Sequence, residues 1–255
     1  MSPLVPHLLE GKSAAEIAGI ELQTTRQKMT AGDAFRIRMG DTQNIRIEGG
    51  DDRLDRVGYE MVSGEIAVAG DVGSEAGRLM AGGRLTIDGD AGPWAASRMT
   101  DGLIEIAGDA GDRIAGPLAG ETVGMAGGIV IVRGNAGERA GDRLRRGVIL
   151  VEGSAGRYAG SRIIAGTLII RGHAGELPGY LLQRGTIVLG AGCEKHSPTF
   201  VDCGVHEPLA FRLLAAFLDP LSPSLARLIR RPLRRLAGDM AVSGKGEILQ
   251  PAART

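Results

Sequence analysis

Four residues in the last third of the chain are of the types that bind zinc. Cysteine thiolates and histidine imidazoles are preferred zinc ligands, and here the spacing is Cys-x2-His-x6-Cys-x2-His, at Cys193, His196, Cys203 and His206. The six-residue gap is shorter than the separation usual between the ligand pairs of a zinc module. The same segment contains Pro198, Phe200 and Val201, which are typical of a chain that packs onto the end of a domain. The residues favour packing and leave metal binding open.

Two glycine-rich stretches raise the possibility of a phosphate site. The segment 116–128 holds five glycines, but a dinucleotide fingerprint requires a helix directly after its glycines, and no helix-length segment follows. Gly11, Lys12 and Ser13 resemble the end of a Walker A motif, yet Pro6 stands where its first glycine belongs. Ser13 and Glu16 instead form a helix capping box. We expect a surface loop and a helix start, and no phosphate site.

No arrangement of nucleophile, base and acid is visible. His7 lies near the N-terminus. His173 lies in a glycine phrase that the chain repeats, as described below, and the other copies have Asp, Asn or Ser at the same position. Acidic residues are scattered over corners, where Asp favours turn geometry. The sequence therefore assigns no catalytic residue, no cofactor-binding residue and no metal ligand to this chain.

A repeated glycine phrase is the dominant feature of the sequence. Gly-x-Ala-Gly or Gly-x-Val-Gly begins at 70, 89, 108, 134, 153 and 172. Every step is 19 residues except one of 26, which contains the seven extra residues of the 116–128 segment. Each phrase follows a short alternating strand. A 19-residue period with such strands is too short for a helix-pair repeat or a propeller blade.

Four columns of like residues repeat at this period. The first two are aliphatic and two positions apart on each strand: Ile45, Ile66, Leu85, Ile104, Val130, Ile149, Leu168, Ile187, and Ile47, Val68, Ile87, Ile106, Val132, Val151, Ile170, Leu189. The third precedes the strand and the fourth lies in the phrase: Met61, Met80, Met99, Met125, Leu144, Ile163, Leu182, and Val72, Ala91, Ala110, Ala136, Ala155, Ala174. The pattern predicts an all-β fold, a parallel β-helix of about 19-residue coils; the asparagine signature of leucine-rich repeats is absent.

The outward strand positions change character along the solenoid. Arg46, Ala67, Thr86 and Glu105 give way to Ile131, Leu150, Ile169 and Val188, with Ile129 and Val148 beside them. An exposed patch of this kind would promote association. The segment 207–219 reads as an amphipathic helix with apolar positions Leu209, Leu213, Leu214, Ala216 and Phe217. We expect this helix to cover most of the patch, with a partner protein at its margin.

Composition bounds the remaining possibilities. The chain has 255 residues, 43% of them hydrophobic and 41 of them glycine, and its formal net charge is zero. No global field recruits nucleic acid or a membrane surface, two cysteines make no disulfide framework, and the N-terminus has no signal-peptide pattern. We expect a cytoplasmic protein with an N-terminal extension (1–40), a parallel β-helix (41–192) and a C-terminal cap with helices and a tail (193–255).

A set of ordered motifs extends along residues 13–249. The motifs are "AGDAFRI" (31–37), "GMAGGIVIVRGNAGERAG" (124–141), "AGTLIIRGHAG" (165–175), "RGTIVL" (184–189), "PTFVDCG" (198–204) and "GDMAVSGKGEIL" (238–249). They are similar to the C subunit of formylmethanofuran dehydrogenase and of the related bacterial formyltransferase/hydrolase complex, and the repeats alone resemble the C-terminal domain of glutamate synthase.

The resemblance implies a right-handed β-helix with short helical extensions, acting as a non-catalytic member of a complex. In the bacterial version the complex moves a formyl group from a tetrahydromethanopterin carrier to a methanofuran-type cofactor and releases formate, with metals on the partner subunits. The archaeal dehydrogenase, which interconverts carbon dioxide and formylmethanofuran, is the alternative. A separate glutamate-synthase-like domain is a third. The excess of 26 arginines over 4 lysines favours a bacterial source.

The arginine-rich tail adds one open question. Ser222 precedes a short predicted helix that Pro232 should end or kink. The cationic residues are Arg227, Arg230, Arg231, Arg234 and Arg235. Three interpretations are open for these arginines. They form a solvated face, they dock onto an acidic partner, or they contact the glutamates that the resemblance implies for a methanofuran-type cofactor.

Overall fold

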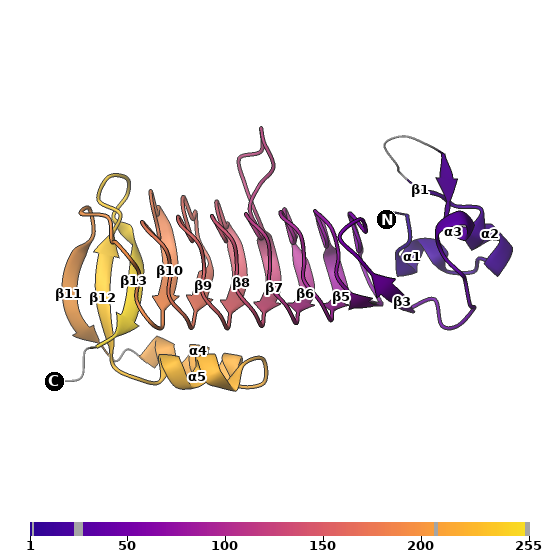
Figure 1. Ribbon diagram of the computed structural model, residues 1–255. Helices are drawn as coiled ribbons and strands as arrows, with labels where there is room; N and C mark the ends of the chain where they lie inside the picture. The colour runs from indigo at the N-terminus through magenta and orange to yellow at the C-terminus, as the bar shows by residue number, and fades with distance from the viewer. Residues whose placement is uncertain (2, 23–27, 207–208, 253–255) are drawn as a thin grey trace.

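The structure is a computed structural model that describes residues 1, 3–22, 28–206 and 209–252. Figure 1 shows an elongated solenoid with a small helical unit at one end and a strand-and-helix cap at the other. In the described residues one sheet of eleven strands runs in the order β11-β12-β13-β10-β9-β8-β7-β6-β5-β4-β3. None of the described helices is long and apolar enough to cross a membrane.

The solenoid wall consists of parallel strands in regular register. Ile66 pairs with Leu85, and Val148 pairs with Thr167, each one 19-residue coil apart. The strands are β3 (Asn44–Gly50), β4 (Glu65–Gly70), β5 (Ala81–Ile87), β6 (Asp101–Ile106), β7 (Ala126–Val132), β8 (Arg146–Val151), β9 (Thr167–Ile170) and β10 (Arg184–Leu189). The prediction of a parallel solenoid of about 19-residue coils is confirmed.

The four predicted columns form the core. Of the strand columns only Ile45, on the first coil, is partly exposed; the methionine-to-leucine column is fully buried, and the small residues of the corner are almost so. The small column forms a ladder of isolated parallel bridges from Val72 through Ala174 to Cys193. The interior is thus filled by aliphatic and methionine side chains stacked on their own kind.

The variable position of the glycine phrase forms a hydrogen-bond ladder outside the core. The Asp71 carboxylate accepts from the Asp90 amide at 2.8 Å, and Asp90 accepts from the Asp109 amide at 2.7 Å. Asp109, Asn135 and Ser154 continue the ladder to the amide of His173. The sequence predicted turn geometry for these acids; the structure shows that each one also ties its coil to the next.

The glycines of the repeated phrase lie where the backbones of neighbouring coils come into close contact. A Cβ on Gly134 would lie 2.2 Å from the Asp109 side chain and 2.6 Å from the Gly108 carbonyl oxygen. Left-handed backbone occurs elsewhere in the coil, at Gly141, but also at Arg139 and Arg143 with φ of 56° and 52°. Such φ values are uncommon for residues with long side chains. Glycine spacing therefore marks where neighbouring coils touch, and does not mark every tight turn.

The N-terminal unit packs beside the first coil. It contains α1 (Pro6–Leu9), α2 (Ala14–Ala18), β1 (Glu21–Leu22), β2 (Met29–Thr30) and α3 (Ala31–Ala34). Ser13 caps α2, and its amide and hydroxyl both donate to the Glu16 carboxylate, which confirms the capping box. The N-terminal ammonium donates to the Asp55 carbonyl at 2.9 Å, which ties this unit to the solenoid.

The C-terminal segment continues the sheet in an order that differs from chain order. It contains β11 (Val201–His206), α4 (Leu209–Leu218), α5 (Pro223–Ile229), β12 (Leu233–Gly238) and β13 (Lys245–Pro251). β13 pairs parallel with β10 and acts as one more rung, while β12 and β11 follow antiparallel. The chain thus leaves the solenoid, builds its helices, and returns to the wall.

Replacement of Ile149 by Asp tests the inward assignment. Ile149 is 0% exposed, so the carboxylate would be buried without a partner, and we expect the free energy of unfolding to fall by several kcal/mol. Ile149→Val is the matched control and should cost about 0.5–1.5 kcal/mol. Chemical denaturation measures both. An aspartate variant as stable as the control would contradict the assignment.

Variants of Asp90 test the corner ladder. Asp90→Ala removes the acceptor for the Asp109 amide and should lower the Tm by about 2–4 °C. Asp90→Asn keeps an acceptor oxygen and removes one of three stacked negative charges, so its Tm should equal or exceed that of the wild type, most clearly at low salt. Equal losses for both variants in thermal unfolding would show that the ladder does not depend on this acceptor.

Candidate interaction surfaces

The four zinc-type residues do not converge on a common centre. Among the described residues, which include all four, no group of three or more His, Cys, Asp or Glu side chains could hold a metal ion. Cys193 takes the small-residue position of the last corner, against Ala174. His196 lies 3.3 Å from the Gln250 amide oxygen, and His206 bonds the Cys203 carbonyl oxygen at 2.8 Å. The segment packs and pairs as strand and corner.

Burial sets the ionisation of two of these residues. It raises the pKa of the Cys193 thiol, so the metal-binding thiolate is disfavoured there. It also lowers the pKa of His196, whose Nδ1 is buried without a hydrogen-bond partner among the described residues. Both pKa shifts arise because the two side chains are partly buried at the end of the solenoid, where the charged form of each is less well solvated.

The seven-residue insertion is a projecting loop, as predicted, and stands out from the coil between β6 and β7 (Figure 1). Its base is held by Glu121, whose carboxylate lies 2.7 Å from the Arg78 guanidinium and 3.6 Å from that of Arg98. Arg78 holds the pKa of Glu121 below its ordinary value. The 116–128 segment runs directly into strand β7, and no helix follows its glycines. The sequence did not predict this clamp because its partners are 43 residues apart.

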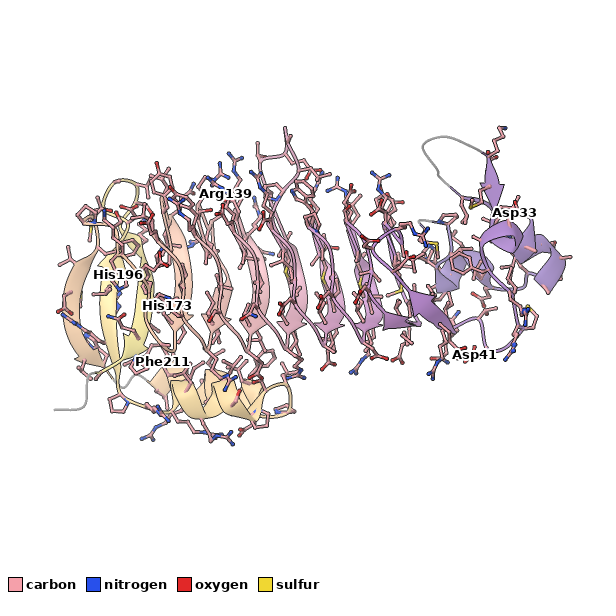
Figure 2. The ribbon with its side chains drawn as sticks, in the orientation of Figure 1. Asp33, Asp41, Arg139, His173, His196 and Phe211 are labelled. Atoms are coloured by element: carbon pink, nitrogen blue, oxygen red, sulfur yellow. The ribbon has the colours of Figure 1, made fainter. Side chains whose placement is uncertain are left out.

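The remaining residues that the sequence analysis considered one by one lie at separate places in the structure. His173 donates its backbone amide to the Ser154 hydroxyl and lies on the exposed wall (Figure 2). His7 lies in α1, and Lys12 is exposed between α1 and α2. The sequence predicted no chemistry at these positions, and the structure brings none of them together.

A groove of 710 Å³ lies between the N-terminal unit and the first coil. Its lining is largely apolar, with Phe35, Ile45 and Ile47 among it, and Arg46 on its edge is ion-paired with Glu48 at 3.5 Å. The described lining contains no histidine, cysteine or lysine. The groove therefore offers shape and apolar surface. Its two carboxylates have partners within the chain: Asp41 accepts from the Gln43 amide and the Asn44 side chain, and Glu48 pairs with Arg46.

The aliphatic patch on the outer wall is covered by the chain itself. Ile131, Leu150, Ile169 and Val188 are at most 1% exposed and form a second core with residues of α4 and α5. Figure 1 shows both helices along this side of the solenoid. The prediction that the C-terminal helix covers the patch is confirmed, but α5 shares the role. Glu207, where the predicted helix began, lies outside the described residues.

The predicted contact face of α4 was wrong in part. Leu214 is half-buried as predicted, but Leu209, Leu213 and Phe217 are 70%, 68% and 45% exposed, and Ala216 is exposed as well. Phe211, Ala215 and Leu218 take their place against the patch (Figure 2 labels Phe211). Almost every position of α4 is apolar, so helical spacing alone did not distinguish its two sides.

A carboxylate–hydroxyl contact anchors the helical pair. Glu152, on the solenoid wall, accepts hydrogen bonds from the hydroxyls of Ser222 and Ser224, and Ser222 also caps α5 by accepting from the Leu225 amide. Burial opposes the charge on Glu152, but these hydroxyls, with Arg133 and Arg171, outweigh it and lower the pKa of that carboxyl. The sequence indicated Ser222 only as a helix start.

The arginine-rich tail is divided between two elements. Pro232 follows α5, as predicted, but Arg234 and Arg235 lie on strand β12 rather than on a continuing tail. Arg234 pairs with Asp202, whose pKa it lowers to about 2, and Arg235 pairs with Glu247 at 2.7 Å. Arg230 pairs with Asp219. A single cationic face is thus wrong for these three, which have partners within the chain.

The structure defines a glycine-patterned parallel β-solenoid whose two ends are capped and whose functional features lie on its surfaces. Comparison with known proteins narrows this class. No family model matches the chain. The chain is 47% identical to the Fhc C subunit of the formyltransferase/hydrolase complex of Methylorubrum extorquens over 249 residues, covering 98% of this chain and 93% of that protein. The chain belongs to the family of Fhc C subunits.

A solved structure agrees with this assignment. The crystal structure of the formyltransferase/hydrolase complex FhcABCD of Methylorubrum extorquens, in complex with methylofuran, contains a chain that matches with a TM-score of 0.94 and 43% identity. The match covers 98% of this chain and 93% of that one. Of the alternatives that the sequence left open, the comparisons support the hydrolase-complex member.

Leu225→Asp tests the cover over the patch. Leu225 is fully buried between α5 and the wall, so a carboxylate there should detach the helices and expose the aliphatic patch. We expect strong binding of a hydrophobic dye while the β-sheet signal in circular dichroism persists. Arg227→Asp, on the exposed side of the same helix, is the matched control. Dye binding equal to that of the control would show that α5 is not needed to cover the wall.

Proposed function

We propose that this chain is a non-catalytic scaffold within a formyltransferase/hydrolase complex. In that complex a formyl group moves from a tetrahydromethanopterin carrier to a methanofuran-type cofactor and is then released as formate. The observation that carries the proposal is the near full-length match to the C subunit of such a complex. The reacting groups and metals belong to the partner subunits, and the complex works in the cytoplasm.

The composition of the solenoid supports the scaffold role. Its interior is aliphatic from the first coil to the last, apart from the small corner column that ends at Cys193. Two partly buried carboxylates, Glu121 and Glu152, are engaged in holding the insertion and the helical pair. A general base must be free to reach a substrate proton, and neither carboxylate meets that condition.

The geometry also suits a scaffold physically. Stacked coils form a rigid rod in which each residue contacts only adjacent coils, so the distance between two surface points is fixed by the number of coils between them. Such a rod can hold separate partner surfaces at set positions. The solenoid would thereby keep the transferase and hydrolase sites in a constant arrangement.

Activity measurements on the separated and reconstituted protein test the proposal. The purified chain alone should release no formate from a formylated methanofuran-type cofactor, whereas addition of the other subunits should restore formyl transfer and formate release. Omission of this chain from the reconstitution mixture is the control and should reduce assembly. Formate release by the pure chain at a rate comparable to that of the complex would contradict the scaffold role.

A further inference from the structure

Helix α4 is apolar on the side that faces away from the solenoid. Leu209, Leu213 and Phe217 recur every four residues, so they lie on one side of the helix, and all three are exposed. Ala210 and Ala216, exposed beside them, add no polar group. A helix that is hydrophobic all round is normally buried all round. The solenoid buries one side of α4 and leaves the other open.

The neighbouring helix shows that this exposure is specific to α4. α5 buries Leu225, Ala226, Leu228 and Ile229, and its exposed side carries Arg227. The two helices pack together on the same wall, yet only α4 presents large aliphatic and aromatic side chains outward. Covering the wall needs one apolar side of each helix, so the outer side of α4 is not required for that cover in the part of the chain that the structure describes.

The charge around this surface indicates what it faces. Between residues 209 and 235 the chain has six arginines and one aspartate. Three of the arginines have acidic partners within the chain, as described above. Arg212, Arg227 and Arg231 are exposed and make no ion pair among the described residues. An apolar helix side within an arginine-rich segment has the composition of a protein–protein interface, where arginine and aromatic residues are enriched.

We propose that the outer side of α4 is the surface by which this chain docks onto another protein of its complex. The occupant is a helical surface, apolar at its centre and acidic at its rim. Rows of side chains four residues apart fit the grooves between side chains of a second helix, and carboxylates would pair with Arg212, Arg227 and Arg231. The docking surface is defined as Leu209, Leu213 and Phe217 with those three arginines.

This inference rests on the proposed function, because it assumes that the partner belongs to the same complex. The experiment co-expresses the chain with the other subunits of the complex and measures co-purification and affinity. The test variant is L209S/L213S/F217S. The control is V62S/V242S, because Val62 and Val242 are 51% and 43% exposed and lie outside α4 and α5.

The triple variant should keep the wild-type circular dichroism and a Tm close to that of the wild type, because the three side chains are exposed. Its affinity for the partner subunits should fall by about 30-fold or more, the loss typical of an interface hot spot. The control should assemble as the wild type does. Replacement of Arg212, Arg227 and Arg231 by Gln should slow association most at low salt.

Three results would overturn the inference. The first is full assembly of the triple variant. The second is a wild-type chain that forms dimers in analytical ultracentrifugation while the triple variant is monomeric, which would assign the surface to a second copy. The third is binding of the wild type, but not the triple variant, to phosphatidylcholine vesicles containing phosphatidylglycerol, which would assign it to a membrane. Failure of the wild-type chain to join the complex at all would instead contradict the proposed function.

Discussion

The fold depends on the hydrogen bonding of each coil to the next, at a usual coil length of 19 residues. Parallel pairing places Ile66 on Leu85 and Ile149 on Leu168, and a change of one residue within a strand would turn every inward side chain outward. Chain length can vary only where the backbone leaves the wall. The insertion therefore projects between β6 and β7, and Ala110 still pairs with Ala136 behind it.

The repeat explains why so much of the fold was visible in the sequence. Equivalent positions of successive coils have the same environment, so an inward strand position recurs eight times as an aliphatic residue. The corner position recurs in the same way as a small residue. Contacts that occur only once in the chain leave no repeated pattern in the sequence from which they could be predicted. The Glu121–Arg78 and Glu152–Ser222 contacts join residues 43 and 70 positions apart, and no local pattern relates them. The spacing of the four zinc-type residues suggested a common site. In the structure Cys193 lies in the last corner of the solenoid, whereas Cys203 and His206 lie on the edge strand β11.

The error on α4 has the same physical origin. Helical periodicity identifies a buried side only when the opposite side is polar. In "LAFRLLAAFL" only Arg212 is charged, so two apolar sides fit equally well by sequence. The structure places Phe211, Leu214 and Leu218 against the patch. The ambiguity was thus a property of the helix itself: it is composed to be in contact on both sides.

Two apolar surfaces of the chain are consequently satisfied in different ways. The outer aliphatic patch is covered by α4 and α5, and the strands on either side of the helical pair, β11 and β12, join the solenoid sheet through β13. The anchor at Glu152 adds hydrogen bonds that depend on an ionised carboxylate. Its lowered pKa means that this contribution is present above the unfolded-state pKa and is lost as the pH falls through the folded-state value. The outer side of α4 has no comparable cover. A cap that is rigidly attached yet apolar outside presents its surface without the entropy cost of ordering a mobile segment on binding, which is the property that a scaffold requires of a docking element.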